Sequence, residues 1–175
     1  MRKLHNYLSN ISVPKFIFMA TIPQLLISIV IIVIANGILP MPSDFNKDSI
    51  TSTANIYNLL ITVGIVGPFI ETIIFQSFII SIFFCFSETK RLKIISIICS
   101  SLIFGFIHYL NTKNSSISWS IFYGLRSGLF GVILSYTYVL YYSKTNTKMK
   151  AILYTFLVHA LNNSLAIVID HYLGL

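Results

Sequence analysis

Five long apolar runs alternate with short polar segments along the chain. Each run is long enough to cross a bilayer as a helix, which takes about 20 residues. A longer polar loop, residues 41–53, separates the first run from the second. The pattern predicts an all-α fold, a polytopic transmembrane helical bundle of about five spans. The runs extend over Phe16 to Leu39, Ile56 to Phe86, Leu92 to Leu110, Ile117 to Tyr142 and Ala151 to Ile169.

The second run is longer than one crossing needs and has helix-disturbing residues in its middle. Gly64, Gly67 and Pro68 lie there, and proline removes a backbone donor and kinks or restarts a helix. We therefore expect a kinked or split second span. A split at Pro68 would place Glu71 in the first turn of a new helical piece, where free amide groups favour a negative charge.

Composition excludes a soluble protein. Of the 175 residues, 55% are hydrophobic and only 10% are charged, so a soluble core is too small to hide the apolar side chains. We expect an integral membrane protein, in a bacterial cell membrane, with membrane lipid as its surroundings.

The net charge of +7 indicates orientation in the membrane and predicts no nucleic-acid partner. Lys and Arg gather near the ends of the apolar runs, and three clusters fall on the same side of a five-span bundle. The positive-inside rule then places the N-terminus in the cytoplasm. The clusters are Arg2, Lys3 and Lys15; Lys90, Arg91 and Lys93; and Lys144, Lys148 and Lys150.

Four polar side chains lie inside the apolar runs: Glu71, His108, His159 and Asn163. A carboxylate at the centre of a bilayer costs about 2.5 to 3.5 kcal/mol on insertion scales, so such a group usually has a partner or a reaction. His159 and Asn163 are four residues apart and share one helix face, as do Phe104 and His108. A carboxylate, two imidazoles and a carboxamide can together activate water and stabilise an oxyanion.

Three motifs in this order resemble the CAAX-protease and bacteriocin-processing membrane proteases, which include type 2 CAAX prenyl endopeptidases. The likeness covers roughly residues 64–166, and the motifs are Pro68 to Gln76 with Glu71, Phe104 to His108, and His159 to Asn163. It implies a catalytic helical core over residues 54–175, preceded by a segment, residues 1–53, with the first span and the polar loop.

The resemblance also implies an activity. The protein would be an intramembrane endopeptidase that cleaves a membrane-associated peptide or protein, in peptide or bacteriocin processing or in self-immunity. Glu71 with His108 would activate water, and His159 with Asn163 would hold the oxyanion.

Two positions of the first motif depart from the family pattern. Thr72 stands where a second glutamate is usual, and Gln76 stands where an arginine is usual. Relative to the usual motif, this chain lacks one negative and one positive charge. Losing both members of a buried ion pair destabilises a protein less than losing one of them. Arg126, in the fourth span, is a candidate replacement that would pair with Glu71. We expect Thr72, Gln76, Phe104 and Arg126 to support the site or bind substrate.

Several alternatives remain open from the sequence. No cofactor is expected, but Glu71, His108 and His159 would be the ligands if a divalent metal such as zinc were bound. The polar groups can instead serve as hydrogen-bonding contacts between helices. A catalytically degenerate binding or immunity protein with the same cavity, or a small ion or proton carrier, are the other functions to be distinguished.

Overall fold

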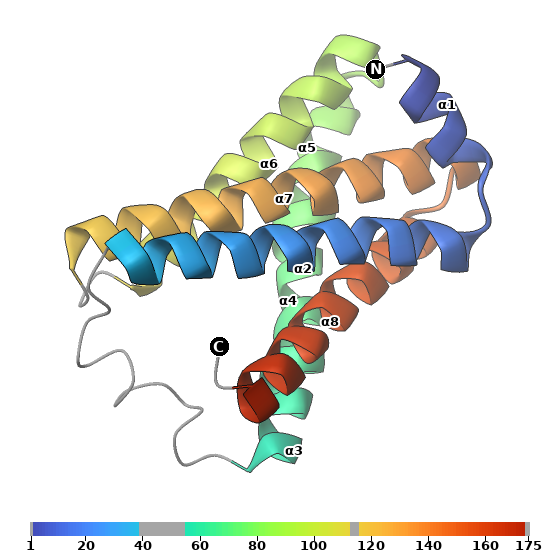
Figure 1. The fold of residues 1–175 in the computed structure, drawn as a ribbon. Coiled ribbons are helices and arrows are strands. Elements are labelled where there is room, and N and C mark those ends of the chain that lie inside the picture. The colour runs from blue at the N-terminus through green and yellow to red at the C-terminus, as the bar shows by residue number, and fades with distance from the viewer. Residues whose placement is uncertain (1, 39–54, 113–115, 174–175) are drawn as a thin grey trace.

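The computed structural model describes residues 2–38, 55–112 and 116–173, and the described chain is helical throughout, with no strand. The loop predicted at residues 41–53 lies outside these ranges. A short helix, α1, precedes the first long helix, and five shorter elements stack end to end to form the second span (Figure 1). The elements are α1 (Arg2–Asn10), α2 (Val13–Ile38), α3 (Ile56–Ile61), η1 (Thr62–Val66), α4 (Gly67–Glu71), η2 (Thr72–Phe78), α5 (Ile79–Phe86), α6 (Lys90–Asn111), α7 (Ile117–Thr145) and α8 (Lys148–Leu173).

The prediction of five spans is confirmed. Five helical segments of the described chain are long and apolar enough to cross a membrane, and they coincide with the five runs of the sequence: Val13–Val30, Ile56–Phe86, Lys90–Asn111, Ile117–Thr145 and Lys148–Tyr172. In Figure 1, α2 lies across the bundle beside α7, and the stacked elements α3 to α5 pass behind them. Helix α8 packs against α2, α7 and the second span, so it is central to the bundle.

The bundle has its polar side chains inside and its apolar ones outside. Ser100, on α6, is fully buried, and its Oγ donates to the carbonyl oxygen of Phe75 at 2.7 Å and lies 2.7 Å from Ser135 Oγ. Large apolar side chains such as Phe78 and Leu102 are instead exposed. Small hydroxyl residues between helices and bulky hydrocarbon at the surface are what a lipid solvent favours. The protein is an integral membrane protein.

The second span is one uninterrupted helical run whose irregularity is a change of helix type. Two π-helical segments, η1 and η2, flank the α-helical turn that contains Pro68. The Gly67 N–H bonds to the Thr62 carbonyl, five residues earlier, which widens the turn where proline supplies no donor. Because the helix does not restart at Pro68, Glu71 is not in the first turn of a new piece, and the expected stabilisation by a helix N-terminus is wrong.

Helices α6 and α7 approach closely because glycines meet at their contact. A Cβ atom added to Gly105 would lie 2.7 Å from the Gly124 carbonyl oxygen and 2.9 Å from Gly128 Cα, and one added to Gly124 would lie 2.7 Å from Tyr109 Cβ. The backbones can touch only because these positions lack side chains. This contact fixes α6, which carries His108, against α7, which carries Arg126.

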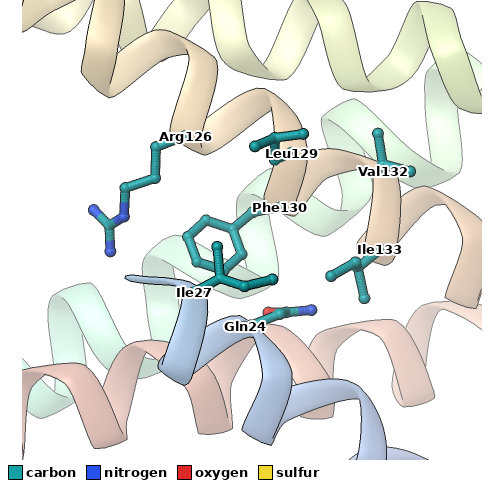
Figure 2. A pocket seen from close by; sticks show the side chains of 7 residues that line it. All are labelled: Gln24, Ile27, Arg126, Leu129, Phe130, Val132 and Ile133. Carbon is teal, nitrogen blue, oxygen red and sulfur yellow. The ribbon is translucent and has the colours of Figure 1, made fainter. Parts of the chain in front are cut away.

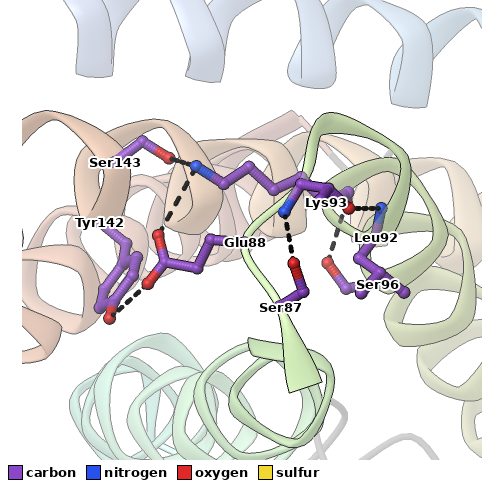
Figure 3. Close-up of polar contacts among 8 residues, drawn as sticks. Ser87, Glu88, Leu92, Lys93, Ser96, Tyr142 and Ser143 are labelled. Atoms are coloured by element: carbon purple, nitrogen blue, oxygen red, sulfur yellow. Dashed lines mark hydrogen bonds and ion pairs between the residues drawn. The ribbon is translucent and has the colours of Figure 1, made fainter. Parts of the chain in front are cut away.

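A polar cluster joins the turn between α5 and α6 to the end of α7 (Figure 3). Lys93 Nζ donates to Ser143 Oγ at 2.8 Å and lies 3.8 Å from a carboxylate oxygen of Glu88. The Tyr142 hydroxyl donates to the other Glu88 oxygen at 3.2 Å. These contacts fasten the beginning of α6 to the end of α7.

Candidate active site

A contact between a carboxyl group of the second span and an imidazole of α8 forms the centre of the candidate site. Glu71, the last residue of α4, places its Oε2 3.5 Å from Nε2 of His159 on α8. His159 is buried, whereas the Glu71 side chain is about one-third exposed (31%). Shortly before these residues the same two helices also meet, where the Phe69 and Phe156 rings pack edge to face with their centroids 5.6 Å apart. Two side chains 88 positions apart in the sequence thus share one point within the bundle.

The Phe104 ring contacts both histidines of the site. Its centroid lies 4.3 Å from that of His108 and 5.9 Å from that of His159, and the Phe75 ring packs on it at 5.3 Å. Phe104 therefore connects the two imidazoles through aromatic contacts.

A backbone contact fixes the His108 ring and its tautomer. Nδ1 lies 2.9 Å from the Phe104 carbonyl oxygen, one turn earlier on α6. A carbonyl only accepts, so the proton of a neutral His108 is on Nδ1, and Nε2 carries a lone pair. His108 thus has one nitrogen that anchors it and one that can accept a proton from a reacting group.

Asn163 lies one turn beyond His159 on α8 and contacts the second span at a different level. Its Nδ2 donates to the Val63 carbonyl oxygen at 3.2 Å. In the π-helical geometry of η1, the N–H of residue 68 would donate to the Val63 carbonyl oxygen, but residue 68 is proline and has no N–H. The N–H of the preceding residue, Gly67, donates to the Thr62 carbonyl oxygen instead. Asn163 therefore satisfies a carbonyl that Pro68 leaves without a backbone partner, and its second amide hydrogen remains available.

Thr72 and Gln76, the two departures from the family motif, follow Glu71 in the sequence, and both side chains are fully buried. Within the described part of the chain, the Thr72 hydroxyl and both amide atoms of Gln76 have no hydrogen-bond partner, nor does Nδ1 of His159. Unpaired buried polar atoms are rare in proteins and are costly in an apolar medium. These side chains can bind water or the polar groups of a bound peptide.

Arg126 is directed toward α2 and does not pair with Glu71. Its Nη2 donates to Ser28 Oγ at 3.1 Å, and its guanidinium lies over the rings of Tyr123 and Phe130, at 5.9 and 5.3 Å from their centroids. Among the described residues, the imidazole of His159 is the ionisable group in contact with Glu71. The predicted pairing of Arg126 with Glu71 is therefore not formed. It fails because Arg126 projects from α7 toward α2, whereas Glu71 faces α8.

Residues 53–165 match the family model described as Rce1-like, type II CAAX prenyl endopeptidase. This match covers well over half of the chain and contains Glu71, His108, His159 and Asn163. The chain belongs to the Rce1-like family. No curated relative and no solved structure matches it. The resemblance read from the three motifs is confirmed at the level of the family, and α1 and α2 precede the Rce1-like region.

The Rce1-like site does not gather its ionisable groups as a metal centre would. Within residues 2–38, 55–112 and 116–173, no three His, Cys, Asp or Glu side chains come together closely enough to hold a metal ion. Glu71 and His159 are in contact, and the contacts of both His159 and His108 include the Phe104 ring. The described side chains do not supply a three-ligand zinc site in this arrangement.

The sequence analysis missed three groups that surround the Rce1-like site. The Tyr123 ring lies 6.0 Å from His108 and also under Arg126, so it connects the two. Ser28 holds Arg126, and the Val63 carbonyl holds Asn163. Tyr123 had a signal, because it precedes Arg126 by three residues and shares its helix face. Ser28 and the Val63 carbonyl had none.

Proposed function

We propose that the protein is an intramembrane endopeptidase in which Glu71 activates a water molecule for attack on a peptide bond. The observation that supports this most is the Glu71–His159 contact between α4 and α8, next to an anchored His108, in a chain of the Rce1-like family. A carboxylate within a membrane span usually marks a reaction or a transport path. The proposal assigns the other steps of peptide hydrolysis to His108, His159 and Asn163.

In the proposed reaction the Glu71 carboxylate takes a proton from water while the oxygen attacks the peptide carbonyl carbon. His108, held through Nδ1, accepts a hydrogen bond from the same water at Nε2 and orients it. The peptide carbonyl becomes an oxyanion, which receives hydrogen bonds from a ring N–H of His159 and from the second amide N–H of Asn163. When the C–N bond breaks, the proton held by Glu71 passes to the departing amine.

The anchoring contacts support these roles. Asn163 uses one N–H to hold the Val63 carbonyl, which orients the carboxamide before substrate arrives. His108 is fixed in the same way by the Phe104 carbonyl. Groups that are already oriented stabilise a developing charge without a reorganisation cost. The proposed reaction uses no metal, and metal analysis of the purified protein, with activity measured after treatment with a chelator, tests that part.

The proposed substrate is a membrane-associated peptide or protein, reached in the plane of a bacterial cell membrane. A role in peptide or bacteriocin maturation, or in self-immunity, is the finer form of the proposal. The proposed orientation has the N-terminus in the cytoplasm, since the basic residues gather at the helix ends on that side.

The test is cleavage of a quenched fluorescent peptide by the purified protein in lipid vesicles. The probe is a farnesylated peptide that ends in a Cys-aliphatic-aliphatic-X sequence, compared with its unprenylated form. Glu71→Gln removes the base and should lower turnover about 100- to 10,000-fold. Glu88→Gln, which changes an exposed glutamate at the far end of the bundle, should keep wild-type turnover. Wild-type turnover by Glu71→Gln would overturn the assignment.

A second candidate function is a non-catalytic membrane protein that binds a peptide or a lipid-linked partner through the same polar site. The observation that favours it is the replacement at Thr72 and Gln76, whose buried polar atoms have no partner in the described chain. Such a protein would bind the farnesylated probe without cleaving it. Its binding would survive in Glu71→Gln and weaken in Gln76→Leu, which removes the amide at similar volume.

A further inference from the structure

The backbone contact of His108 holds one nitrogen of its ring and leaves the opposite nitrogen to be positioned by packing. Nδ1 is held by the Phe104 carbonyl oxygen, which sets the tautomer. A small rotation of the ring about that contact moves Nε2 most, because Nε2 lies across the ring from it. In the proposed reaction Nε2 orients the attacking water, and a displacement of about 1 Å at a reacting group can cost about 100-fold in rate. The direction of Nε2 therefore needs a second constraint.

Two aromatic rings pack on the His108 imidazole, and they come from different helices. The Phe104 ring, on α6 like His108, lies 4.3 Å away between centroids. The Tyr123 ring, on α7, lies 6.0 Å away and is tilted by 38° to the imidazole. The carbonyl and the ring of Phe104 both hold the imidazole relative to its own helix. The Tyr123 ring holds it relative to a second helix.

The glycine contact between α6 and α7 brings Tyr123 to His108. Gly105 precedes His108 by about one turn of α6, and Gly124 follows Tyr123 directly on α7. A Cβ atom on Gly105 would lie 2.7 Å from the Gly124 carbonyl oxygen, and one on Gly124 would lie 2.7 Å from Tyr109 Cβ. Small residues let the two backbones approach this closely. The contact between the Tyr123 and His108 rings thus follows from the packing of the two backbones.

A cation packs on the Tyr123 ring in turn. The Arg126 guanidinium lies 5.9 Å from the ring centroid and donates to Ser28 Oγ at 3.1 Å, and a cation over an aromatic face is attracted to it. Arg126 also borders a pocket of about 260 Å³ between α2 and α7, whose other lining side chains are apolar except for Gln24 (Figure 2). An apolar space does not attract a charge. The guanidinium therefore stays with the hydroxyl and the rings, where it supports Tyr123.

We propose that Tyr123 is a positioning residue of the active site, whose ring holds the His108 imidazole so that Nε2 keeps one direction. The inference rests on the proposed hydrolysis, in which His108 orients the water. Tyr123 acts by ring contact, because the contacts that the structure gives it, with His108 and Arg126, are made by the ring. Groups of a site must be held within about 10 to 20° of the productive geometry, and packing from neighbouring side chains provides this.

The first test measures cleavage of the farnesylated probe by the full chain in lipid vesicles. Tyr123→Leu removes the ring and should lower kcat about 10- to 100-fold with KM changed less than about 3-fold, because Tyr123 acts on His108 and not on the substrate. Tyr123→Phe keeps the ring and should retain kcat within about 3-fold. The matched control is Phe122→Leu, which removes the neighbouring ring of α7, one that packs on Trp119, and should also keep kcat within about 3-fold.

A double-variant cycle separates positioning from a general effect on stability. In the His108→Gln protein, adding Tyr123→Leu should lower the residual turnover by less than about 3-fold, because the imidazole that Tyr123 positions is already gone. A purely structural effect of Tyr123→Leu would cost as much in the His108→Gln protein as in the wild type. Thermal unfolding of all four proteins in detergent identifies any variant that does not fold.

A spectroscopic measurement tests the position of the ring without using activity. The full chain with isotopically labelled histidine nitrogens is studied in lipid vesicles by solid-state NMR, and the His108 signals are those lost in His108→Gln. The wild type should give one narrow set of His108 signals with the proton on Nδ1. Tyr123→Leu should broaden or split this set, and Tyr123→Phe should leave it narrow. If the wild type cleaves no probe, the proposed hydrolysis fails, whereas these signals still decide whether Tyr123 holds the ring.

The same measurements define the results that reject the role of Tyr123. Equal losses of kcat in Tyr123→Leu and Tyr123→Phe would assign the effect to the hydroxyl and not to the ring. An equal cost of Tyr123→Leu in the wild type and in His108→Gln would show a structural role alone. Unchanged His108 signals, or wild-type kcat, in a folded Tyr123→Leu protein would show that α6 holds the imidazole without help from α7.

Discussion

Glu71 and Arg126 are both ionisable side chains within membrane spans, and the bundle accommodates them in different ways. Glu71 has an ionisable partner, His159, on a neighbouring helix. Arg126 has a serine hydroxyl and two aromatic faces but no carboxylate in the described chain. A carboxylate beside an imidazole can exchange a proton, whereas an arginine does not lose its proton in proteins. One region is therefore suited to proton transfer, and the other holds a fixed charge through a hydroxyl group and aromatic rings.

The two regions share a common frame. Phe104 and His108 project from α6, Tyr123 and Arg126 project from α7, and the glycine contact between these helices holds both sets. Variants that act on one region alone test whether the regions are separate. A variant that separates α6 from α7 should disturb both.

The largest expected effect comes from combining Glu71→Gln with His159→Ala. Each single variant should lower turnover about 100-fold or more. If the two side chains act as one unit, the turnover of the double variant should be no more than about 10-fold below that of the slower single variant. Turnover of the farnesylated probe by the four proteins of this cycle provides the measurement. Losses that multiply would show that the two residues act independently.

Asn163→Ala should have the next largest effect. It removes a proposed oxyanion donor, which is worth about 100- to 1,000-fold in turnover, and the group that satisfies the Val63 carbonyl. Turnover of the same probe, together with thermal unfolding, separates the two losses. Asn162→Ala removes a carboxamide from the neighbouring position of α8 and should cost less than about 10-fold. An equal loss in both variants would argue against a specific role for Asn163.

Gly105→Leu should destabilise both regions. A side chain at this position meets the backbone of Gly124 and Gly128, and overpacking costs about 1 to 3 kcal/mol or more. The temperature of thermal unfolding in detergent and the turnover of the probe should decline together. The matched control is Gly128→Ala, because a Cβ there has its nearest neighbour at 3.6 Å, an ordinary contact. A stable, active Gly105→Leu protein would show that the close approach is not required.

The smallest expected effect is that of Ser28→Ala. It removes the hydrogen bond that Arg126 makes to Ser28 in the described part of the chain and should lower the free energy of unfolding by about 1 kcal/mol, the usual range for a polar contact between membrane helices. Probe cleavage should remain at the wild-type rate, because Ser28 lies on α2, away from Glu71. A large loss of turnover would show that the contacts of Arg126 and the active site are strongly coupled. Denaturation in detergent and the cleavage assay together measure this.

The sequence predicted the fold because membrane spans follow from local composition. Each apolar run is long enough to cross the bilayer and must be helical there, since lipid offers no partner to free backbone groups. The three motifs were also visible, because residues four apart on a helix share a face in any tertiary arrangement. For this reason Phe104 with His108, and His159 with Asn163, could be paired before the structure was known.

The form of the second span was only partly predictable. Proline removes a donor, which can end a helix, kink it or change its type. Here the chain keeps its helical course with π-helical segments, and Asn163 of α8 donates to the carbonyl left free. That solution depends on a helix about 100 residues later in the chain, so local reasoning about Pro68 and Glu71 could not reach it.

The sequence by itself determined which residues lie in helices, that the helices cross a membrane, and which polar side chains each span contains. Only the tertiary structure decided which of those side chains meet. Glu71 meets His159, Arg126 turns to Ser28, and Phe104 contacts both histidines, because helix crossings and the glycine contact of α6 with α7 set the direction in which each face points. Helical periodicity fixes neighbours within a span, whereas contacts between spans depend on packing that no single span encodes.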